Sequence, residues 1–226
     1  MEGKLSPPNI TIIGAWRTGT TLMFFLFEHG FKDVITNQVE SYALETKLPT
    51  RYKWRVSKKP NDAHIIDKIS ALFNPYFIWM LRDPRDCIVS WKARISNYHL
   101  NFEEWKRNND YIENHIAGNP SHRVIKIVYE ELIHRPDEIQ EYLMEKISGL
   151  EKKRDFTGCY LHFDPGNEII HQLGGIRPFD KRAIGKWKLD RQRIRGQLEK
   201  YPDLQDYLVR YGYETDESWQ KELYQD

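Results

Sequence analysis

The chain has little cysteine and no long hydrophobic segment, and each of these absences excludes a class of protein. Only two of its 226 residues are cysteine, Cys87 and Cys159, too few and too far apart in sequence for a disulfide framework or a cysteine-based metal site. No run of residues approaches the roughly 20 apolar positions that a membrane span needs. The apolar run near the start is short and is followed by Arg17 rather than by a small-residue cleavage site. We therefore expect a soluble, cytoplasmic protein.

An excess of charge of one sign is also missing. The 34 Lys and Arg residues nearly balance the 33 Asp and Glu residues, which leaves a formal net charge of +1. This balance excludes a general affinity for nucleic acid or for a membrane surface, so any anion site has to come from local clustering of basic side chains. The hydrophobic fraction of 40% is enough for a folded core, and the length fits one domain, which we expect to span residues 1–226.

Short apolar segments alternate with segments of helical pattern along the chain. Strands are predicted at 9–14, 54–58, 76–81 and 123–129. Helices are predicted at 20–29, 61–73, 84–95, 136–150 and 190–211. This alternation predicts a single α/β domain with a doubly wound parallel sheet flanked by helices. Residues 155–188, rich in Gly, Pro, Asp and aromatic side chains, are predicted to form a long functional loop.

A phosphate-binding loop is predicted directly after the first strand, in the sequence GAWRTGTT at 14–21. It keeps the Gly-x4-Gly spacing and the final Thr of a P-loop, but Thr20 stands where a nucleotide-hydrolysing loop has Lys. The loop amides and the N-terminus of the following helix predict a site for an oxyanion. Arg17 supplies a cation from within the loop.

A second anion-binding segment is predicted after strand 76–81. The strand leads into Arg82, whereas a magnesium-dependent NTPase usually has a metal-holding Asp at this place. An arginine favours a phosphate over a metal, and Ser90, about two helical turns later, can share the same anion. The alternative interpretation is a surface salt-bridge cluster made of Arg82, Asp83, Arg85 and Asp86.

These two segments resemble those of the PAPS-dependent sulfotransferases, in particular the short bacterial members. GAWRTGTT resembles the family's 5′-phosphosulfate loop, and RDPRDCIVS at 82–90 resembles its 3′-phosphate motif. The resemblance implies a P-loop-like fold and transfer of a sulfuryl group from 3′-phosphoadenosine 5′-phosphosulfate (PAPS), without a metal. It also implies an acceptor hydroxyl or amine on a small molecule, lipid or glycan.

Two later segments extend the resemblance. VYEEL at 128–132 resembles the family's Tyr-Glu-x-Leu, whose Tyr lies near the adenine, and KRAIGKWK at 181–188 resembles the C-terminal loop that covers the 3′-phosphate. Leu22 stands where cytosolic members stack a Trp on the adenine. The cofactor-binding residues implied in this way are Arg17, Thr18, Gly19, Thr20, Thr21, Arg82, Ser90, Tyr129, Lys181 and Arg182.

Three residues are candidates for the chemistry. Arg17 is placed to stabilise charge on the bridging oxygen that departs with the nucleotide. By resemblance to the Lys-x-Pro of bacterial members, Lys58 approaches the sulfuryl oxygens. Glu40 lies a little over twenty residues after the loop cation, as does the general base of glycan-directed members, with Glu45 and His64 as alternatives.

Two other functions remain as alternatives. A P-loop-type kinase of nucleotides or small molecules needs a loop Lys and a metal-binding Asp, which Thr20 and Arg82 replace here. A non-catalytic nucleotide-binding module would keep the anion site without turnover. Formation of a sulfated product from PAPS separates this module from an enzyme.

Overall fold

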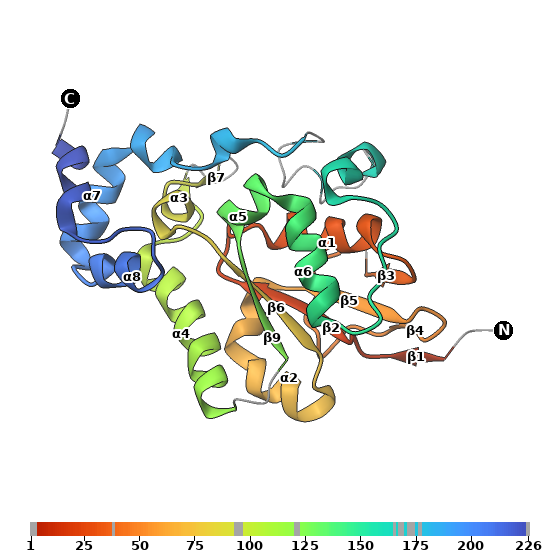
Figure 1. Ribbon diagram of the computed structural model, residues 1–226. Coiled ribbons are helices and arrows are strands. Elements are labelled where there is room, and N and C mark those ends of the chain that lie inside the picture. Colours follow the sequence, from red (N-terminus) through yellow and green to blue (C-terminus); the bar gives the residue numbers. More distant parts are fainter. Residues whose placement is uncertain are drawn as a thin grey trace.

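A five-stranded parallel sheet forms the centre of the protein. The computed structural model describes residues 4–37, 39–92, 97–119, 123–164, 166, 170, 175 and 178–224. The strand order is β3-β5-β2-β6-β9, and all neighbours in it are parallel (Figure 1). The strands are β2 (Ile10–Gly14), β3 (Val34–Thr36), β5 (Trp54–Lys58), β6 (Tyr76–Leu81) and β9 (Val124–Val128). The predicted α/β fold with a doubly wound parallel sheet is confirmed.

Helices cover both faces of this sheet because successive side chains of a strand point to opposite faces. In β6, Ile78 and Met80 belong to one hydrophobic cluster, whereas Phe77 and Trp79 belong to the other. The first face is covered by α1 (Thr20–Gly30), α5 (Tyr129–His134), α6 (Pro136–Lys146) and the 3-10 helix η3 (Phe156–His162). The second face is covered by η1 (Pro60–Ile65), α2 (Ile66–Phe73), α3 (Pro84–Ile88), α4 (Phe102–Gly118), α7 (Arg191–Lys200) and α8 (Leu204–Arg210).

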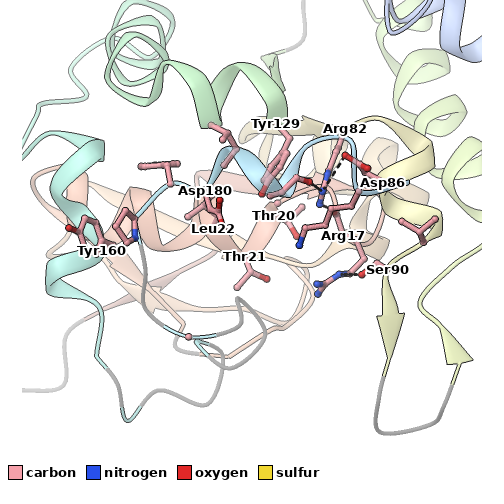
Figure 2. A pocket seen from close by; sticks show the side chains of 18 of the residues that line it. Arg17, Thr20, Thr21, Leu22, Arg82, Asp86, Ser90, Tyr129, Tyr160 and Asp180 are labelled. Atoms are coloured by element: carbon pink, nitrogen blue, oxygen red, sulfur yellow. Dashed lines mark hydrogen bonds and ion pairs between the residues drawn. The ribbon is translucent and has the colours of Figure 1, made fainter. Parts of the chain in front are cut away.

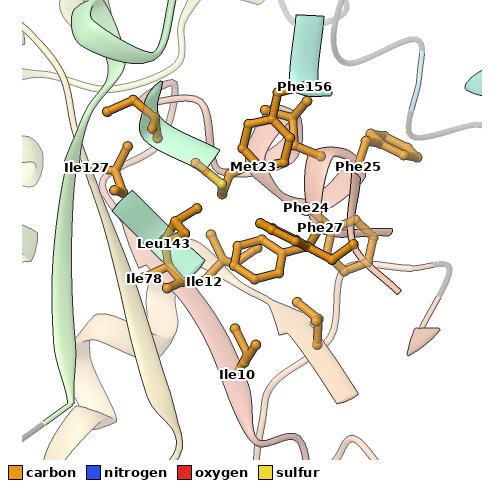
Figure 3. Packing of buried hydrophobic residues seen from close by; sticks show 14 of the residues in the cluster. Ile10, Ile12, Met23, Phe24, Phe25, Phe27, Ile78, Ile127, Leu143 and Phe156 are labelled. Carbon is orange, nitrogen blue, oxygen red and sulfur yellow. The ribbon is translucent and has the colours of Figure 1, made fainter. Parts of the chain in front are cut away.

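Aromatic side chains fix α1 on the sheet (Figure 3). Phe24, Phe25 and Phe27 are at most 1% exposed and pack in the first cluster with Phe156 of η3. Burial of each such side chain is worth about 1.5–3 kcal/mol. Because α1 follows the glycine loop directly, this packing holds the loop against the carboxyl end of β2.

Several predicted helices differ from the structure, and the one predicted at 61–73 is divided into η1 and α2. The helix predicted at 84–95 ends at Ile88, and Trp91–Lys92 forms β7, paired antiparallel with β8 (Asn97–Tyr98), while residues 93–95 lie outside the described part of the chain. The hairpin begins where the amide of His99 donates to the carbonyl of Ser90. The single helix predicted at 190–211 is divided into α7 and α8 around Pro202, whose missing amide hydrogen and ring disfavour a helix interior.

Several elements were not predicted at all. Helix α4 begins with a capping box between Asn101 and Glu104, and β1 (Leu5–Ser6) pairs with β4 (Leu48–Pro49) outside the main sheet. The described part of the predicted long loop includes the 3-10 helices η3 and η5 (Lys181–Ala183) and most of η6 (Lys186–Leu189), and η7 (Glu217–Tyr224) closes the described chain. Among the helices of the described residues, none has the length and apolar character needed to cross a membrane.

Replacement of Gly14 by alanine should strongly destabilise the fold. Gly14 has a φ of 144°, and an added Cβ would lie 2.4 Å from the carbonyl oxygen of Met80 on the neighbouring strand. We expect Gly14→Ala to lower the free energy of unfolding by about 2–5 kcal/mol. The matched control is Gly196→Ala in α7, where an added Cβ meets nothing within 4 Å and should stabilise by up to about 1 kcal/mol. Urea unfolding measures both, and equal midpoints for the two variants would contradict this account.

Candidate active site

The loop after β2 is shaped for an anion. Arg17 and Gly19 have positive φ values of 71° and 95°, so the chain turns sharply before α1 begins at Thr20. The first turn of α1 has no acidic residue and no side-chain cap. Its amides and the positive end of the helix dipole therefore remain for a negatively charged ligand.

The side chain of Thr18 forms a hydrogen bond within the phosphate-binding loop itself. Its hydroxyl donates to the carbonyl of Ala15 at 2.7 Å, and the residue is fully buried. The geometry therefore places Thr18 in the support of the loop, and it is not among the residues that line the neighbouring pocket.

A pocket of about 420 Å³ lies over this loop (Figure 2). Tyr160 lies at one end and Arg82 and Ser90 at the other, with Thr20 and Leu22 between them. Of the predicted cofactor-binding residues, those that line this pocket are Arg17, Gly19, Thr20, Thr21, Arg82, Ser90 and Tyr129. Seven of the ten predicted cofactor-binding residues, which come from segments far apart in the chain, therefore line one continuous cavity.

Two arginines and a serine meet at the polar end of the pocket. The Nε of Arg17 donates to the Oγ of Ser90 at 2.7 Å, and the Nη1 of Arg82 donates to the carbonyl of Arg17 at 2.9 Å. Burial, and then the charge of Arg82, lower the pKa of Arg17. Arg82 lies over the ring of Tyr129, 4.3 Å from its centre, and its Nε is buried without a hydrogen-bond partner among the described residues.

The carboxylate of Asp86 ties this end of the pocket to the C-terminal segment. It accepts hydrogen bonds from the amides of Gly185 and Trp187 at 2.8 and 3.0 Å, and it lies 3.7 Å from the guanidinium of Arg82. The Nη2 of Arg82 also donates to the carbonyl of Ala183 at 2.6 Å. Asp86 lines the pocket and was not predicted as a site residue.

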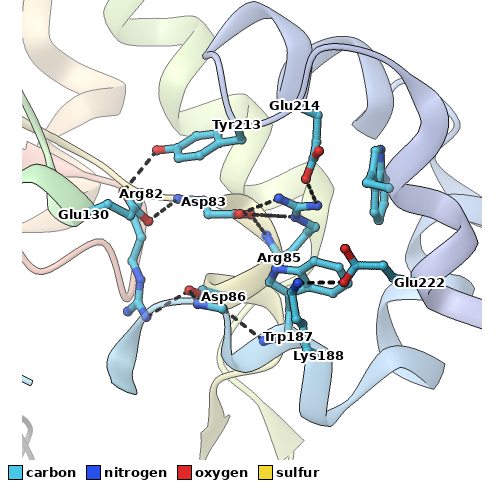
Figure 4. Close-up of polar contacts among 12 residues, drawn as sticks. Arg82, Asp83, Arg85, Asp86, Glu130, Trp187, Lys188, Tyr213, Glu214 and Glu222 are labelled. Atoms are coloured by element: carbon cyan, nitrogen blue, oxygen red, sulfur yellow. Dashed lines mark hydrogen bonds and ion pairs between the residues drawn. The ribbon is translucent and has the colours of Figure 1, made fainter. Parts of the chain in front are cut away.

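All four residues of the salt-bridge cluster considered from the sequence form ion pairs, and two of them, Asp83 and Arg85, belong to a network beside the pocket (Figure 4). Arg85 pairs with Asp83 at 2.8 Å and with Glu214 at 2.5 Å, and its guanidinium lies between the rings of Trp187 and Trp219, at 4.3 and 4.7 Å from their centres. This network joins α3 to the C-terminal segments. Arg82 differs from Arg85 because it also lines the pocket.

Lys58 and Glu40 form an ion pair beside the phosphate loop. The ammonium of Lys58, a residue only 1% exposed, lies 2.9 Å from Glu40 Oε1 and donates to the Oγ1 of Thr21 at 3.2 Å. Burial lowers the pKa of Lys58, and the charge of Glu40 opposes this effect. Neither residue lines the pocket, but Thr21, which does, lies in contact with Lys58.

Asp62 anchors the segment that carries Glu40. Its Oδ2 accepts the amide of Ala43 at 3.0 Å, while its Oδ1 is buried without a partner among the described residues. Burial raises the pKa of Asp62 to about 7, although the Ala43 amide and Lys59 oppose the shift. Lys59 adds a second anchor because its ammonium lies 5.1 Å from the ring centre of Tyr42.

The two alternatives for a general base, Glu45 and His64, do not line this pocket either. Glu45 is exposed and does not line it. His64 packs against Tyr111 of α4, with 5.0 Å between the ring centres, and burial lowers its pKa. Neither is brought to the phosphate loop as Glu40 is.

The predicted basic pair of the C-terminal segment does not line the pocket. Lys181 and Arg182 are exposed, and Arg182 pairs with Asp180 at 2.9 Å. Lys186 of the same segment does line the pocket. Lys181 and Arg182 lie in η5 and the exposed Lys186 begins η6, and the sequence pattern alone did not show which of these basic residues would line the pocket. The roles of Lys181 and Arg182 stay predictions.

Fold and site together define an α/β protein with a P-loop-like loop between β2 and α1. The sequence profile of a family described as "Sulfotransferase family" matches residues 28–151, and the chain belongs to this family. The matched span includes Arg82, Ser90 and Tyr129 but begins after the phosphate loop. A search of curated proteins finds no match.

Solved structures share the fold. The "Sulfotransferase Domain from the Curacin Biosynthetic Pathway" is 17% identical with a TM-score of 0.61, and the alignment covers 81% of this chain and 91% of that one. The "Sulfotransferase Domain from the Synechococcus PCC 7002 Olefin Synthase" is 16% identical with a TM-score of 0.58, over 83% of this chain and 90% of that one. At these identities the likeness concerns the fold.

Ionisation of Asp62 should weaken the fold as the pH rises. Because its folded pKa of about 7 is raised above the usual 3.8, the stability that protonated Asp62 contributes is present at low pH and is lost as the pH rises toward about 7. Asp62→Asn keeps an acceptor for the Ala43 amide but does not ionise. Melting temperatures from pH 4 to 8 should show wild type losing stability relative to Asp62→Asn across this window. A constant difference would contradict the shift.

Proposed function

We propose that this protein transfers a sulfuryl group from PAPS to a hydroxyl or amine of a small-molecule, lipid or glycan acceptor. One observation carries the proposal: the phosphate loop and the segment 82–90 line one pocket and are joined by the bond from Arg17 to Ser90. A pocket of about 420 Å³ is in the range of small-molecule sites.

The polar end of the pocket suits a 3′-phosphate. Arg82 lines the pocket, and its guanidinium offers a positive charge and N–H donors to a phosphate. Ser90 and Lys186 line the same cavity. Because Arg82, Ser90 and Lys186 offer donors and positive charge, they are the residues that we assign to the 3′-phosphate.

The remaining parts of the pocket suit the other parts of the nucleotide. The amides at Gly19 and Thr20 are assigned to the 5′ side, at the start of α1. Leu22, Tyr129 and Phe179 line the pocket and offer the apolar and aromatic surface that an adenine ring needs. The Leu22 side chain takes the place of a stacking Trp with an aliphatic contact.

Three charged residues carry the proposed chemistry. Sulfuryl transfer breaks the bond between sulfur and the bridging oxygen and forms a bond from sulfur to the acceptor atom, whose proton must leave. Arg17 stabilises the charge that develops on the bridging oxygen, and Lys58 stabilises the sulfuryl oxygens. Glu40 accepts the acceptor's proton as general base. These fixed cations provide the charge stabilisation in this proposal, so we propose no metal.

The alternatives are less well supported by the site. A P-loop-type kinase would need a cation at the position of Thr20 and a metal-binding carboxylate at the position of Arg82. A non-catalytic nucleotide-binding module would use the same pocket. Labelled PAPS mixed with pools of candidate acceptors tests for turnover: a labelled product supports the enzyme, and its absence from every pool favours the module. A strict requirement for Mg²⁺, seen as loss of product in EDTA, would favour the kinase.

Adenosine 3′,5′-bisphosphate, the nucleotide product of the proposed reaction, should bind more tightly than AMP or ATP because only it carries a 3′-phosphate. Arg82→Ala should weaken its binding roughly ten- to hundredfold, since a charge-assisted contact is worth about 1.5–3 kcal/mol. Titration calorimetry measures both effects. Equal affinity of the wild type for AMP and the bisphosphate would remove the main support for PAPS.

Arg17→Ala and Glu40→Gln should differ in their response to the acceptor. Arg17→Ala should lower kcat by about 10²-fold or more, because it removes charge stabilisation at the leaving group. Glu40→Gln should lower kcat with nearly unchanged affinity for PAPS, and an acceptor of lower pKa should partly restore its rate. The same acceptor should not restore Arg17→Ala. Normal turnover of Glu40→Gln would move the base to Glu45 or His64.

A further inference from the structure

The C-terminal segment presents one particular basic side chain to the pocket. Of its basic residues, Lys186 lines the cavity, whereas Arg182 pairs with Asp180 and Lys188 pairs with Glu222 at 2.7 Å. No ion pair of Lys186 is found among the described residues. Lys186, although exposed, is therefore the basic residue of this segment that lies beside a ligand in the pocket.

The position of Lys186 depends on a carboxylate from another part of the chain. The two amides that flank it, those of Gly185 and Trp187, both donate to Asp86, at 2.8 and 3.0 Å. The Asp86 side chain is fully buried, and Arg82 lies 3.7 Å from it. The backbone on either side of Lys186 is therefore fixed to the segment that also carries Arg82.

We infer that Asp86 is a positioning residue that holds Lys186 at the Arg82 end of the pocket. It thereby sets the preference for nucleotides that carry a 3′-phosphate over those that do not. The inference rests on the proposed function and extends it by naming the residue that positions Lys186. Nothing in the sequence of the segment distinguishes Lys186 from its basic neighbours.

If only charge mattered, neutralisation of Asp86 would strengthen the binding of a 3′-phosphate, whereas the positioning role predicts that it weakens this binding. A carboxylate beside an anion site repels the ligand, so its neutralisation would tighten binding if repulsion were the main effect. Its charge is already compensated by Arg82 and by two amide donors. An asparagine offers only one oxygen, and its amide nitrogen would face one of the two backbone donors. We therefore expect loss of position to outweigh loss of repulsion.

The test is a double-mutant cycle measured as a selectivity ratio. Calorimetry gives the dissociation constants of AMP and of adenosine 3′,5′-bisphosphate for wild type, Asp86→Asn, Lys186→Ala and the double variant. The selectivity ratio is the dissociation constant of AMP divided by that of the bisphosphate. We expect each single variant to lower this ratio by roughly tenfold, because one charge-assisted contact to the 3′-phosphate is lost. The double variant should lose little more, because both changes remove the same contact.

Control variants separate positioning from a general loss of structure. Lys188→Ala removes a neighbouring charge that is paired with Glu222 and should keep the wild-type ratio. Lys186→Arg should retain most of the preference. If Asp86→Asn does not fold, as judged by its melting transition, Asp86→Ser takes its place in the cycle, because a hydroxyl still accepts one amide.

The outcomes distinguish this inference from the proposed function. A ratio that rises in Asp86→Asn, or single effects that add in the double variant, would overturn the positioning role while leaving the proposed function in place. Equal weakening of both nucleotides by Asp86→Asn would also overturn it, since that is the effect of a merely structural residue. A wild-type protein that shows no preference for the bisphosphate would instead contradict the proposed function.

Discussion

The arrangement of the site depends on one buried guanidinium, that of Arg82 at the carboxyl end of β6. Its side chain is 11% exposed and donates to the carbonyls of Arg17 and Ala183, at 2.9 and 2.6 Å. A buried charge has to be compensated by partners, so this one position holds together the phosphate loop and the C-terminal segment. Its Nε is buried without a hydrogen-bond partner among the described residues.

The sequence predicted the elements whose pattern is set locally. Strands β5 and β6 begin and end as predicted, because Trp54–Lys58 and Tyr76–Leu81 combine β-branched or aromatic residues with clear boundaries. Elements fixed by tertiary contacts were missed or misjudged. Helix α4 has a mostly polar sequence and is held by a few buried residues such as Trp105, and α3 ends at Ile88 because the chain enters a hairpin.

The same division applies to the candidate site. Arg17, Arg82 and Ser90 could be recognised because strand ends and loop spacing bring them to one edge of a parallel sheet. Asp86 and Lys186 could not, because their orientation depends on hydrogen bonds between segments about a hundred residues apart. The pairing of Glu40 with Lys58 was likewise invisible, although each residue had been predicted separately.

A crystal structure of the protein with adenosine 3′,5′-bisphosphate tests the central claim most directly. The account predicts the 5′-phosphate on the amides at Gly19 and Thr20, and the 3′-phosphate in contact with Arg82, Ser90 and Lys186. A nucleotide bound with its 3′-phosphate in solvent, or outside this pocket, would contradict the account.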